Sequence, residues 1–489
     1  MLRRIMSSTK LAWSVALIVV TISTAAGVFL WKRVIMAPWD EEFAYTKGVQ
    51  AAVYAFPYVL NSSLRYVWAQ PAKESERITA PVDAVNQFWL APQLANAKYR
   101  DGGGPNNDTA YSTAWVFADK EPIVVSVPDI GVIPGTDKPR YFSFHIGAFD
   151  SDNIGYIGTR TTGNQAGHYA IIPKGWNGKL PDNVKQVGES PTPWFLIVGR
   201  TMVTGPDDFP AVAALMKQYK LRTLSDFMSG VDRRPPAPPV PPAPHYLKEQ
   251  TLLLSQFWSI ANAAMTENPP NAVDKRLVDT FAEIEVGPGR DLSKLSDGMR
   301  RGLDRAALRG LPMLREVNKS DYEKKVVNGW KYPPTYYGRA GAQGAFLTRA
   351  ALQSLGGIIV HDPEEAVYVI GSRDAAGDRL DGSSNYRITF PKGKLPPAKS
   401  FWSVTLYDDT LNLVENSIDR YSLGDRTPGL VFNDDGSMSF YIGHAPPKNG
   451  PQSNWLPAPK GQFFLVMRIY IPGQEVVEQR WVPPAMEKQ

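Results

Sequence analysis

A glycine-rich block at residues 102–115, GGGPNNDTAYSTAW, carries the first side chains that could do chemistry. Its glycines and proline predict a tight loop that leads into a strand, which brings Asn106, Asp108 and Tyr111 close together. Polar groups on a loop held by a rigid sheet are a common way to build a site. Asp108 is the candidate for acid–base work, with Asn106 and Tyr111 positioning a ligand. The alternative is a turn whose side chains bond their own backbone.

A second block combines FDSDNIGYIGTRTTG at residues 149–163 with WFLIVGR at residues 194–200. An arginine within an apolar strand needs a carboxylate or a bound anion, because an unpaired buried charge is costly. A guanidinium fork suits a carboxylate, a phosphate or a sugar acid. The alternative is structural ion pairs with Asp108 and Asp150. The candidate ligand-binding residues of this block are Asp150, Asn153, Arg160 and Arg200.

A third block, at residues 401–427 and 453–461, is rich in aromatic, amide and carboxylate side chains. This mixture fits stacking on a sugar ring with polar groups reading its hydroxyls, and it equally fits an aromatic core whose ring tips find hydrogen bonds. Exposure of Trp402, Trp455 or Tyr421 would favour glycan or protein binding, and burial of these rings would count against it. The candidates here are Asp408, Asn416, Arg420, Tyr421 and Trp455.

Several kinds of site are absent from the sequence. There is no HExxH, GxSxG or GxxxxGK[ST] motif. The chain has no cysteine, which excludes cysteine nucleophiles, thiolate zinc sites and iron–sulfur clusters. Its five histidines are scattered, without a pair at helical spacing. We therefore expect neither a metal nor a cofactor, and the sequence leaves open whether the protein is an enzyme.

The charge is unevenly distributed along the 489 residues. The formal net charge is +5, but residues 1–35 hold five cations and no acid, which leaves 48 charges of each sign in the rest of the chain. Nucleic-acid binding needs net positive charge gathered on one face. The neutral body therefore argues against a nucleic-acid partner.

The N-terminal charges surround a run of 21 uncharged residues, 11–31. A helix of this length is just long enough to cross roughly 30 Å of hydrocarbon. The cations before it predict a cytoplasmic N-terminus, hence a single-pass inner-membrane anchor with the body in the periplasm or outside the cell. The alternative is a cleaved signal peptide, because residues 23–26 are small.

The body alternates between β-like and helical patterns. A helix-like stretch is expected over residues 41–60, with Asp40 as its cap and with Pro57 bending or ending it. Short β-like runs follow to residue 200, and β-like runs return after residue 365. Seven prolines at 235–244 predict a stiff spacer, followed by helices.

The expected fold is mainly β with a helical section (α+β), as two antiparallel sandwich-like or barrel-like domains. The predicted parts are an anchor or signal at 1–35, a β-rich domain at 40–230, a proline-rich and helical section at 231–335, and a second β-rich domain at 336–489.

The three blocks together resemble bacterial two-domain proteins that join domain-of-unknown-function family 1254 to family 1214. The first resemblance covers about residues 44–228, through PNNDTAYS at 105–112 and GTRTTG at 158–163. The second covers about residues 336–484, through the long motif at 416–430 and NWLPAPKG at 454–461. The resemblance implies two β-rich domains and little about the reaction.

We expect a membrane-tethered protein of the cell envelope with a polar pocket for a small anionic or polyhydroxylated ligand. If it is an enzyme, we expect a metal-independent hydrolase or lyase. The alternative is a non-catalytic module that binds a glycan or a partner protein. The expected partners are a small-molecule ligand and, through residues 11–31, the membrane. An oligomer is compatible with the sequence.

Overall fold

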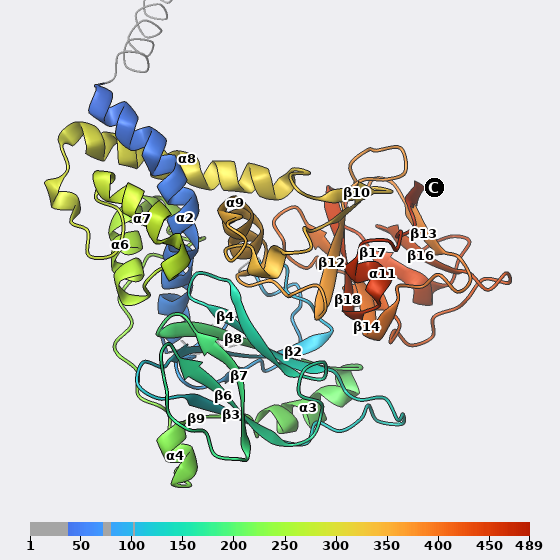
Figure 1. Ribbon diagram of the computed structural model, residues 1–489. Helices are drawn as coiled ribbons and strands as arrows, with labels where there is room; N and C mark the ends of the chain where they lie inside the picture. The colour runs from blue at the N-terminus through green and yellow to red at the C-terminus, as the bar shows by residue number, and fades with distance from the viewer. Residues whose placement is uncertain (1–37, 72–79, 101–102) are drawn as a thin grey trace, which may run out of the picture.

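The computed structural model describes residues 38–71, 80–100 and 103–489, so the predicted membrane segment lies outside the described residues. Within the described part, no helix combines the length and apolar character needed to cross a membrane. The fold is mainly β with helices, and its four sheets are antiparallel or mixed. Figure 1 shows two β-rich regions side by side, with the helices gathered beside the first one.

Two sheets form the first β-rich region, and their facing side chains share one core that includes Ala114, Phe144 and Ile171. One sheet has the order β1-β2-β8-β4-β5 and is antiparallel; the other has the order β7-β6-β3-β9 and includes the parallel pair β6–β7. The strands are β1 (Trp89–Leu90), β2 (Thr109–Phe117), β3 (Ile123–Val127), β4 (Phe142–Ala148), β5 (Asn153–Gly158), β6 (Gly167–Pro173), β7 (Val184–Ser190), β8 (Trp194–Met202) and β9 (Lys220–Thr223).

Two further sheets form the second region, around a core that includes Val404, Phe440 and Met467. Their orders are β10-β11-β12-β18-β14-β15 and β17-β16-β13-β19, with β16 and β17 parallel. The strands are β10 (Lys325–Val327), β11 (Trp330–Tyr332), β12 (Ala366–Gly371), β13 (Tyr386–Phe390), β14 (Ala398–Asp408), β15 (Ser422–Gly424), β16 (Met438–Gly443), β17 (Trp455–Pro457), β18 (Phe463–Pro472) and β19 (Met486–Lys488).

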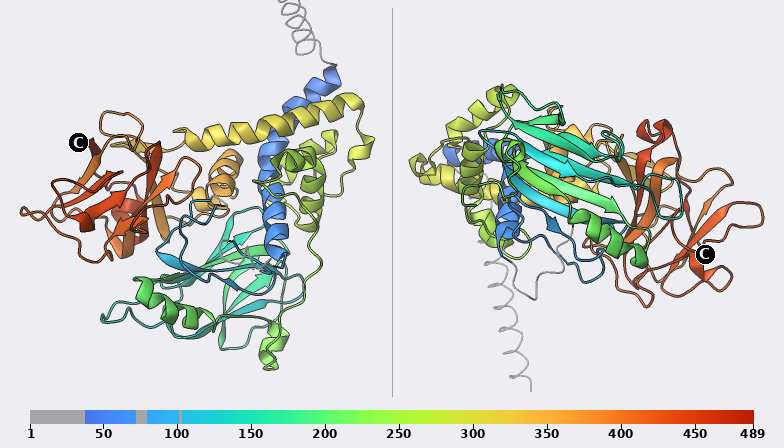
Figure 2. Two further views of the ribbon diagram at one scale, coloured as in Figure 1. Left: turned by 180° about the vertical axis from the view of Figure 1, so that it is seen from behind. Right: turned by 90° about the horizontal axis from the view of Figure 1, so that it is seen from below.

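A layer of helices covers part of the first region, and its core includes Trp115 and Trp194 of the β2–β8 sheet. The left view of Figure 2 shows the long helix α8, in yellow, crossing against α2, in blue. The main helices are α2 (Trp39–Ala69), α3 (Phe209–Met216), α6 (Phe257–Glu267), α7 (Lys275–Phe281) and α8 (Asp297–Lys319).

The start and the course of α2 differ from the sequence prediction. The N-cap is Pro38, so Asp40 lies within the first turn, where its carboxylate accepts a hydrogen bond from Ser296. Pro57 is buried inside the helix, which continues to Ala69. Proline removes one backbone hydrogen bond, and burial of most of the surrounding helix against its neighbours outweighs that loss.

The proline-rich segment at residues 235–244 has no helix or strand, and it is attached to the body at its two ends. Asn86 donates hydrogen bonds to the carbonyl oxygens of Pro235 and Pro236, and Ser63 donates to that of Pro244. The residues between these ends are mostly exposed.

The outer faces of two sheets meet between the β-rich regions. Strand alternation sends Phe195 and Ile197 of β8 into the core between the first two sheets, and it sends Val198 and Arg200 outward. The same alternation in β18 sends Met467 into the second core. Polar side chains on the outward faces, which would meet water on an isolated sheet, are therefore buried between the two regions.

Candidate functional site

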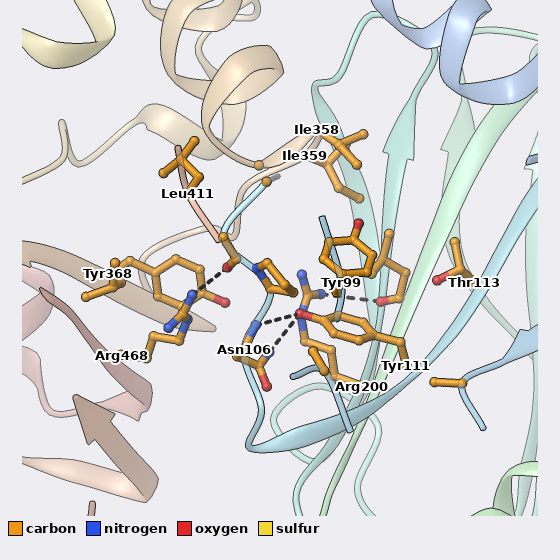
Figure 3. Close-up of a pocket in the computed structure, with 18 of the residues that line it drawn as sticks. Tyr99, Asn106, Tyr111, Thr113, Arg200, Ile358, Ile359, Tyr368, Leu411 and Arg468 are labelled. Atoms are coloured by element: carbon orange, nitrogen blue, oxygen red, sulfur yellow. Dashed lines mark hydrogen bonds between the residues drawn. The ribbon is translucent and has the colours of Figure 1, made fainter. Parts of the chain in front are cut away.

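A cavity of about 230 Å³ lies between the two β-rich regions. Its walls come from β1, β2 and β8 on one side, β12 and β18 on the other, and residues 93–99 and 103–106 between them. Most of its lining is apolar, but two arginines, Arg200 and Arg468, also line it (Figure 3). The apolar lining includes Trp68, Trp89, Leu94, Val198, Ile358, Ile359, Ile370, Leu411, Phe464 and Val466.

Arg200 is the cavity's cation from the first region. It lies on β8 directly opposite Tyr111 of β2, and its guanidinium carbon is 5.7 Å from the centre of that ring. Only 8% of the residue is exposed. Its Nη1 makes one long hydrogen bond, 3.4 Å, to the carbonyl oxygen of Val198, and its buried Nε has no partner. Within the described chain no carboxylate forms an ion pair with it, so the charge is buried without a counter-ion.

Arg468 is the matching cation from the second region. It lies on β18 directly opposite Tyr368 of β12, and its guanidinium lies between that ring and the ring of Tyr407, at 5.1 and 5.3 Å. Its Nη2 donates to the carbonyl oxygen of Gly104 over 2.7 Å, while its buried Nη1 lacks a partner. No ion pair with a carboxylate is found for this arginine either, among the residues that the structure covers.

The segment before β2 is a loop that reaches across to the second region. Gly103 and Gly104 have φ values of +80° and +58°, a conformation that favours glycine. This backbone presents the carbonyl oxygens of Gly104 and Pro105 to the hydroxyl group of Tyr407, which donates to them. Gly103 and Gly104 therefore give the loop the backbone conformation with which it contacts the second region.

Asn106 orders the tyrosine hydroxyl groups beside the cavity. Its Oδ1 accepts hydrogen bonds from the backbone of Asp108 and from both the backbone and side chain of Thr109. Its Nδ2 donates to the hydroxyl oxygens of Tyr111 and Tyr470, over 3.0 and 3.3 Å. Asn106 is thus a positioning residue that joins the two regions. Burial raises the pKa of the Tyr111 phenol, which keeps it a neutral donor.

Two stacked histidines lie beside Tyr156, within reach of the Arg200 charge. The rings of His145 and His361 are 4.5 Å apart, and both residues are essentially fully buried. Burial, with a smaller contribution from the Arg200 charge, holds the pKa of each ring well below its usual range. His145 contacts Asn153 through Nε2, whereas both ring nitrogens of His361 lack a partner in the described structure.

The structure separates Asp108 from the cavity, which corrects the predicted cluster. Its carboxylate accepts hydrogen bonds from Ser403 over 2.6 Å and from Arg426 over 2.7 Å, and the residue is 5% exposed. Both partners belong to the second region. Asp108 therefore has no free oxygen directed at a ligand, and it acts as an ion-pair contact between the regions.

Arg160 is also paired rather than directed into the cavity. Its Nε bonds Glu365 over 2.6 Å, and that carboxylate accepts a second hydrogen bond from Tyr141 over 2.7 Å. Burial raises the pKa of Glu365, and the bonds from Tyr141 and Arg160 act in the opposite direction. The sequence predicted that these side chains would meet at one cleft. Arg200 and Tyr111 do line one cavity, whereas Arg160 does not.

Asp150 lies in the β4–β5 turn and Asn153 begins β5, and both side chains make structural contacts. Asp150 pairs with the fully buried Arg349 over 2.9 Å. The Asn153 amide donates to the carbonyl oxygen of Val360 and to Asp362, both over 2.9 Å. Neither of these two predicted ligand-binding residues lines the cavity. Their side chains instead bind the segment that follows α8.

The candidates in the second region are turn and core residues. Asp408 accepts hydrogen bonds from the Thr410 and Asn412 backbone, and Asn416 accepts one from the backbone of Arg420. The Arg420 guanidinium donates to the carbonyl oxygens of Gln452 and Trp455. The rings proposed for glycan stacking are buried: Trp402, Trp455 and Tyr421 are 3, 4 and 7% exposed. This burial counts against the glycan-binding face.

Sequence reasoning missed Arg468 and the tyrosines around it. The signal was present, since Arg468 is the single charge in the ten-residue apolar strand FFLVMRIYIP. The same rule that selected Arg200 would have selected it. Across residues 38–71, 80–100 and 103–489, no group of three or more acidic or histidine side chains could hold a metal ion.

Two family models match the chain on either side of this cavity. "Protein of unknown function (DUF1254)" matches residues 85–223, which include Arg200, and "Protein of unknown function (DUF1214)" matches residues 365–474, which include Arg468. The predicted resemblance is confirmed, in the predicted order. No curated protein matches the chain.

Among solved structures, the VPA0106 protein of Vibrio parahaemolyticus is similar with a TM-score of 0.66 and 22% sequence identity, over 91% of this chain and 100% of that one. The likeness supports the fold. A protein of Burkholderia cenocepacia matches with a TM-score of 0.43 and 13% identity, over 92% of this chain and 94% of that one, which is too weak to support an argument.

Proposed function

The chain belongs to the proteins that join a DUF1254 domain to a DUF1214 domain, and we propose that the cavity between these two domains binds a small organic anion with an apolar body. The observation that carries this proposal is the pair Arg200 and Arg468, two buried cations without carboxylate partners in the described structure that line one cavity. An uncompensated buried charge is costly, and a bound anion removes that cost.

The rest of the lining supports the apolar body. Side chains such as Ile359, Leu411 and Phe464 surround the arginines, and ligand pockets combine an apolar lining with a few polar groups that fix orientation. The phenol of Tyr111 adds a hydrogen-bonding group beside Arg200. A carboxylate attached to an aliphatic or aromatic group has the complementary chemistry.

Binding is favoured over acid–base catalysis by the titration behaviour around the cavity. A general acid or base works best when its pKa lies near the operating pH. Burial raises the pKa of Tyr111 and lowers that of His361, so both pKa values lie away from neutral pH and both side chains stay uncharged there. The second candidate function is a metal-independent hydrolase or lyase. Incubation of the protein with an envelope extract separates the two: consumption of a metabolite would favour the enzyme, and retention of a metabolite would favour binding.

The proposed setting is the cell envelope. We propose that residues 11–31 anchor the chain in the inner membrane, with two sandwich-like domains in the periplasm or outside the cell. The uncharged length of this segment and the cations beside it support the anchor. Carbonate extraction of membranes tests it: the full-length chain should stay in the pellet, and release of a shortened chain into the soluble fraction would support signal cleavage instead.

Calorimetric titration of the full-length protein in detergent tests the anion site. The probes are carboxylates from butanoate to decanoate and benzoate, each against its uncharged amide. We expect at least one carboxylate to bind ten or more times tighter than its amide, and Arg200→Met to abolish the difference. Arg309→Met, which removes an exposed arginine of α8, is the matched control. Equal binding of acids and amides, or no binding of any acid, would contradict the proposal.

A further inference from the structure

The ion pairs between and beside the two domains do not include the arginines of the cavity. Four nearby acids each pair with another arginine, over 2.6–2.9 Å. Arg200 and Arg468 form no ion pair with a carboxylate in the described structure, so two guanidinium groups line the cavity without a direct anionic partner. The pairs are Asp108–Arg426, Asp150–Arg349, Asp362–Arg339 and Glu365–Arg160.

The two arginines belong to different parts of the fold. They come from different domains and different sheets, and each lies opposite its own tyrosine, Tyr111 for Arg200 and Tyr368 for Arg468. Figure 3 shows the two arginines on either side of the loop that carries Asn106. A ligand with one carboxylate supplies one negative charge for two guanidinium groups, so a second anionic group is needed to match both arginines.

The rest of the cavity suits an uncharged spacer. The side chains that face the cavity around the loop, including Leu411, Ile358 and Ile359, are aliphatic (Figure 3). They offer no hydrogen bonds to a hydroxylated chain and favour methylene groups, because burial of apolar surface is favourable. A compact dianion such as inorganic phosphate does not use this surface.

We infer that the cavity selects an organic dianion in which two carboxylates are separated by a short apolar spacer, one bound by Arg200 of the first domain and the other by Arg468 of the second. This inference rests on the proposed function and specifies its ligand class. Such a ligand joins the two domains, because each end is held by a different one. It also neutralises both buried charges at once.

Matched pairs of acids test this selectivity. Hexanoate, heptanoate and octanoate are compared with the dicarboxylates of the same length, adipate, pimelate and suberate, by calorimetric titration of the full-length protein. We expect at least one diacid to bind ten or more times tighter than its monoacid. Arg468→Met should reduce this preference to threefold or less while monoacid binding remains. Arg468→Lys, which keeps the charge, should retain a preference, and Arg309→Met should behave as wild type.

The outcomes separate the two proposals. Equal affinities for monoacids and diacids in the wild-type protein would overturn the dianion and leave the anion site standing. Tight binding of inorganic phosphate with no preference among the organic acids would overturn it in the same way. If neither series binds, the anion site itself has failed and the dianion with it.

Discussion

The arginines buried between the two domains fall into two groups. Arg349 and Arg426 each have a carboxylate within 2.9 Å, whereas Arg200 and Arg468 have only tyrosine rings and backbone carbonyl oxygens. All four are largely buried, so burial alone does not explain the difference. Arg426 pairs with Asp108 between the two domains and Arg349 pairs with Asp150 beside α2, whereas the unpaired arginines line the cavity.

This difference separates stability from function. Removing one partner of a buried ion pair leaves an uncompensated charge, which is strongly destabilising. An arginine that already lacks a partner costs the protein stability in the absence of a ligand. Natural proteins retain such costs at functional sites. The comparison therefore predicts opposite responses to the loss of charge in the two groups.

The largest effect is expected from Asp150→Ala. This change leaves Arg349, which is 0% exposed, without its carboxylate, and we expect a loss of about 3–5 kcal/mol in the free energy of unfolding, by analogy with other buried pairs. Chemical denaturation measures it. The control is Asp279→Ala, which removes an exposed pair with Lys275 and should cost less than about 0.5 kcal/mol. Equal effects of the two changes would remove the distinction between buried and exposed pairs.

An intermediate effect is expected on the pH dependence of stability. The folded pKa of His361 lies well below its unfolded value of about 6.5, so the unfolded chain binds a proton first as the pH falls. The stability from the neutral ring is present above pH 6.5 and is lost on acidification, by up to about 1.4 kcal/mol per pH unit. Asp152, whose pKa burial raises to about 6, contributes with the opposite sign below that pH.

The variant His361→Phe isolates this contribution. Because both ring nitrogens of His361 lack a partner in the described structure, the phenyl ring should leave stability at pH 7.5 nearly unchanged and reduce the loss between pH 6.5 and 5.5 by about 1 kcal/mol. Denaturation at both pH values measures the change, with the exposed His444→Phe as the control. An unchanged pH slope would mean that the His361 ring is protonated in the folded protein.

The smallest effect on stability is expected from Arg200→Met. No carboxylate loses a partner, and an uncompensated charge is replaced by an apolar side chain of similar length, so the free energy of unfolding should change by less than about 1 kcal/mol or rise. The same denaturation experiment, performed without added anion, measures it. A loss above about 3 kcal/mol would place Arg200 with the paired arginines and remove the main support for the cavity as an anion site.

Much of the architecture could be predicted from local patterns. The long motifs identified both families, and short apolar runs such as WFLIVGR predicted β8 because a short apolar run between turn-forming residues is a local signal of a buried strand. The helix α2 was predicted too short, because the cost of Pro57 is local while the packing that outweighs it comes from α6 and α8. Tyr111 and Arg200 reached the cavity because they are direct cross-strand neighbours.

The sequence by itself determined the families, the alternation that turns Arg200 and Arg468 away from the cores, and the uneven charge of the first 35 residues. Only the tertiary structure decided which arginines have partners. Asp108 and Arg426 are separated by 318 positions, and no local pattern selects one acid for one arginine over that distance. Pairing depends on which outer faces meet when the domains pack, and the cavity lies where that packing leaves two cations without acids.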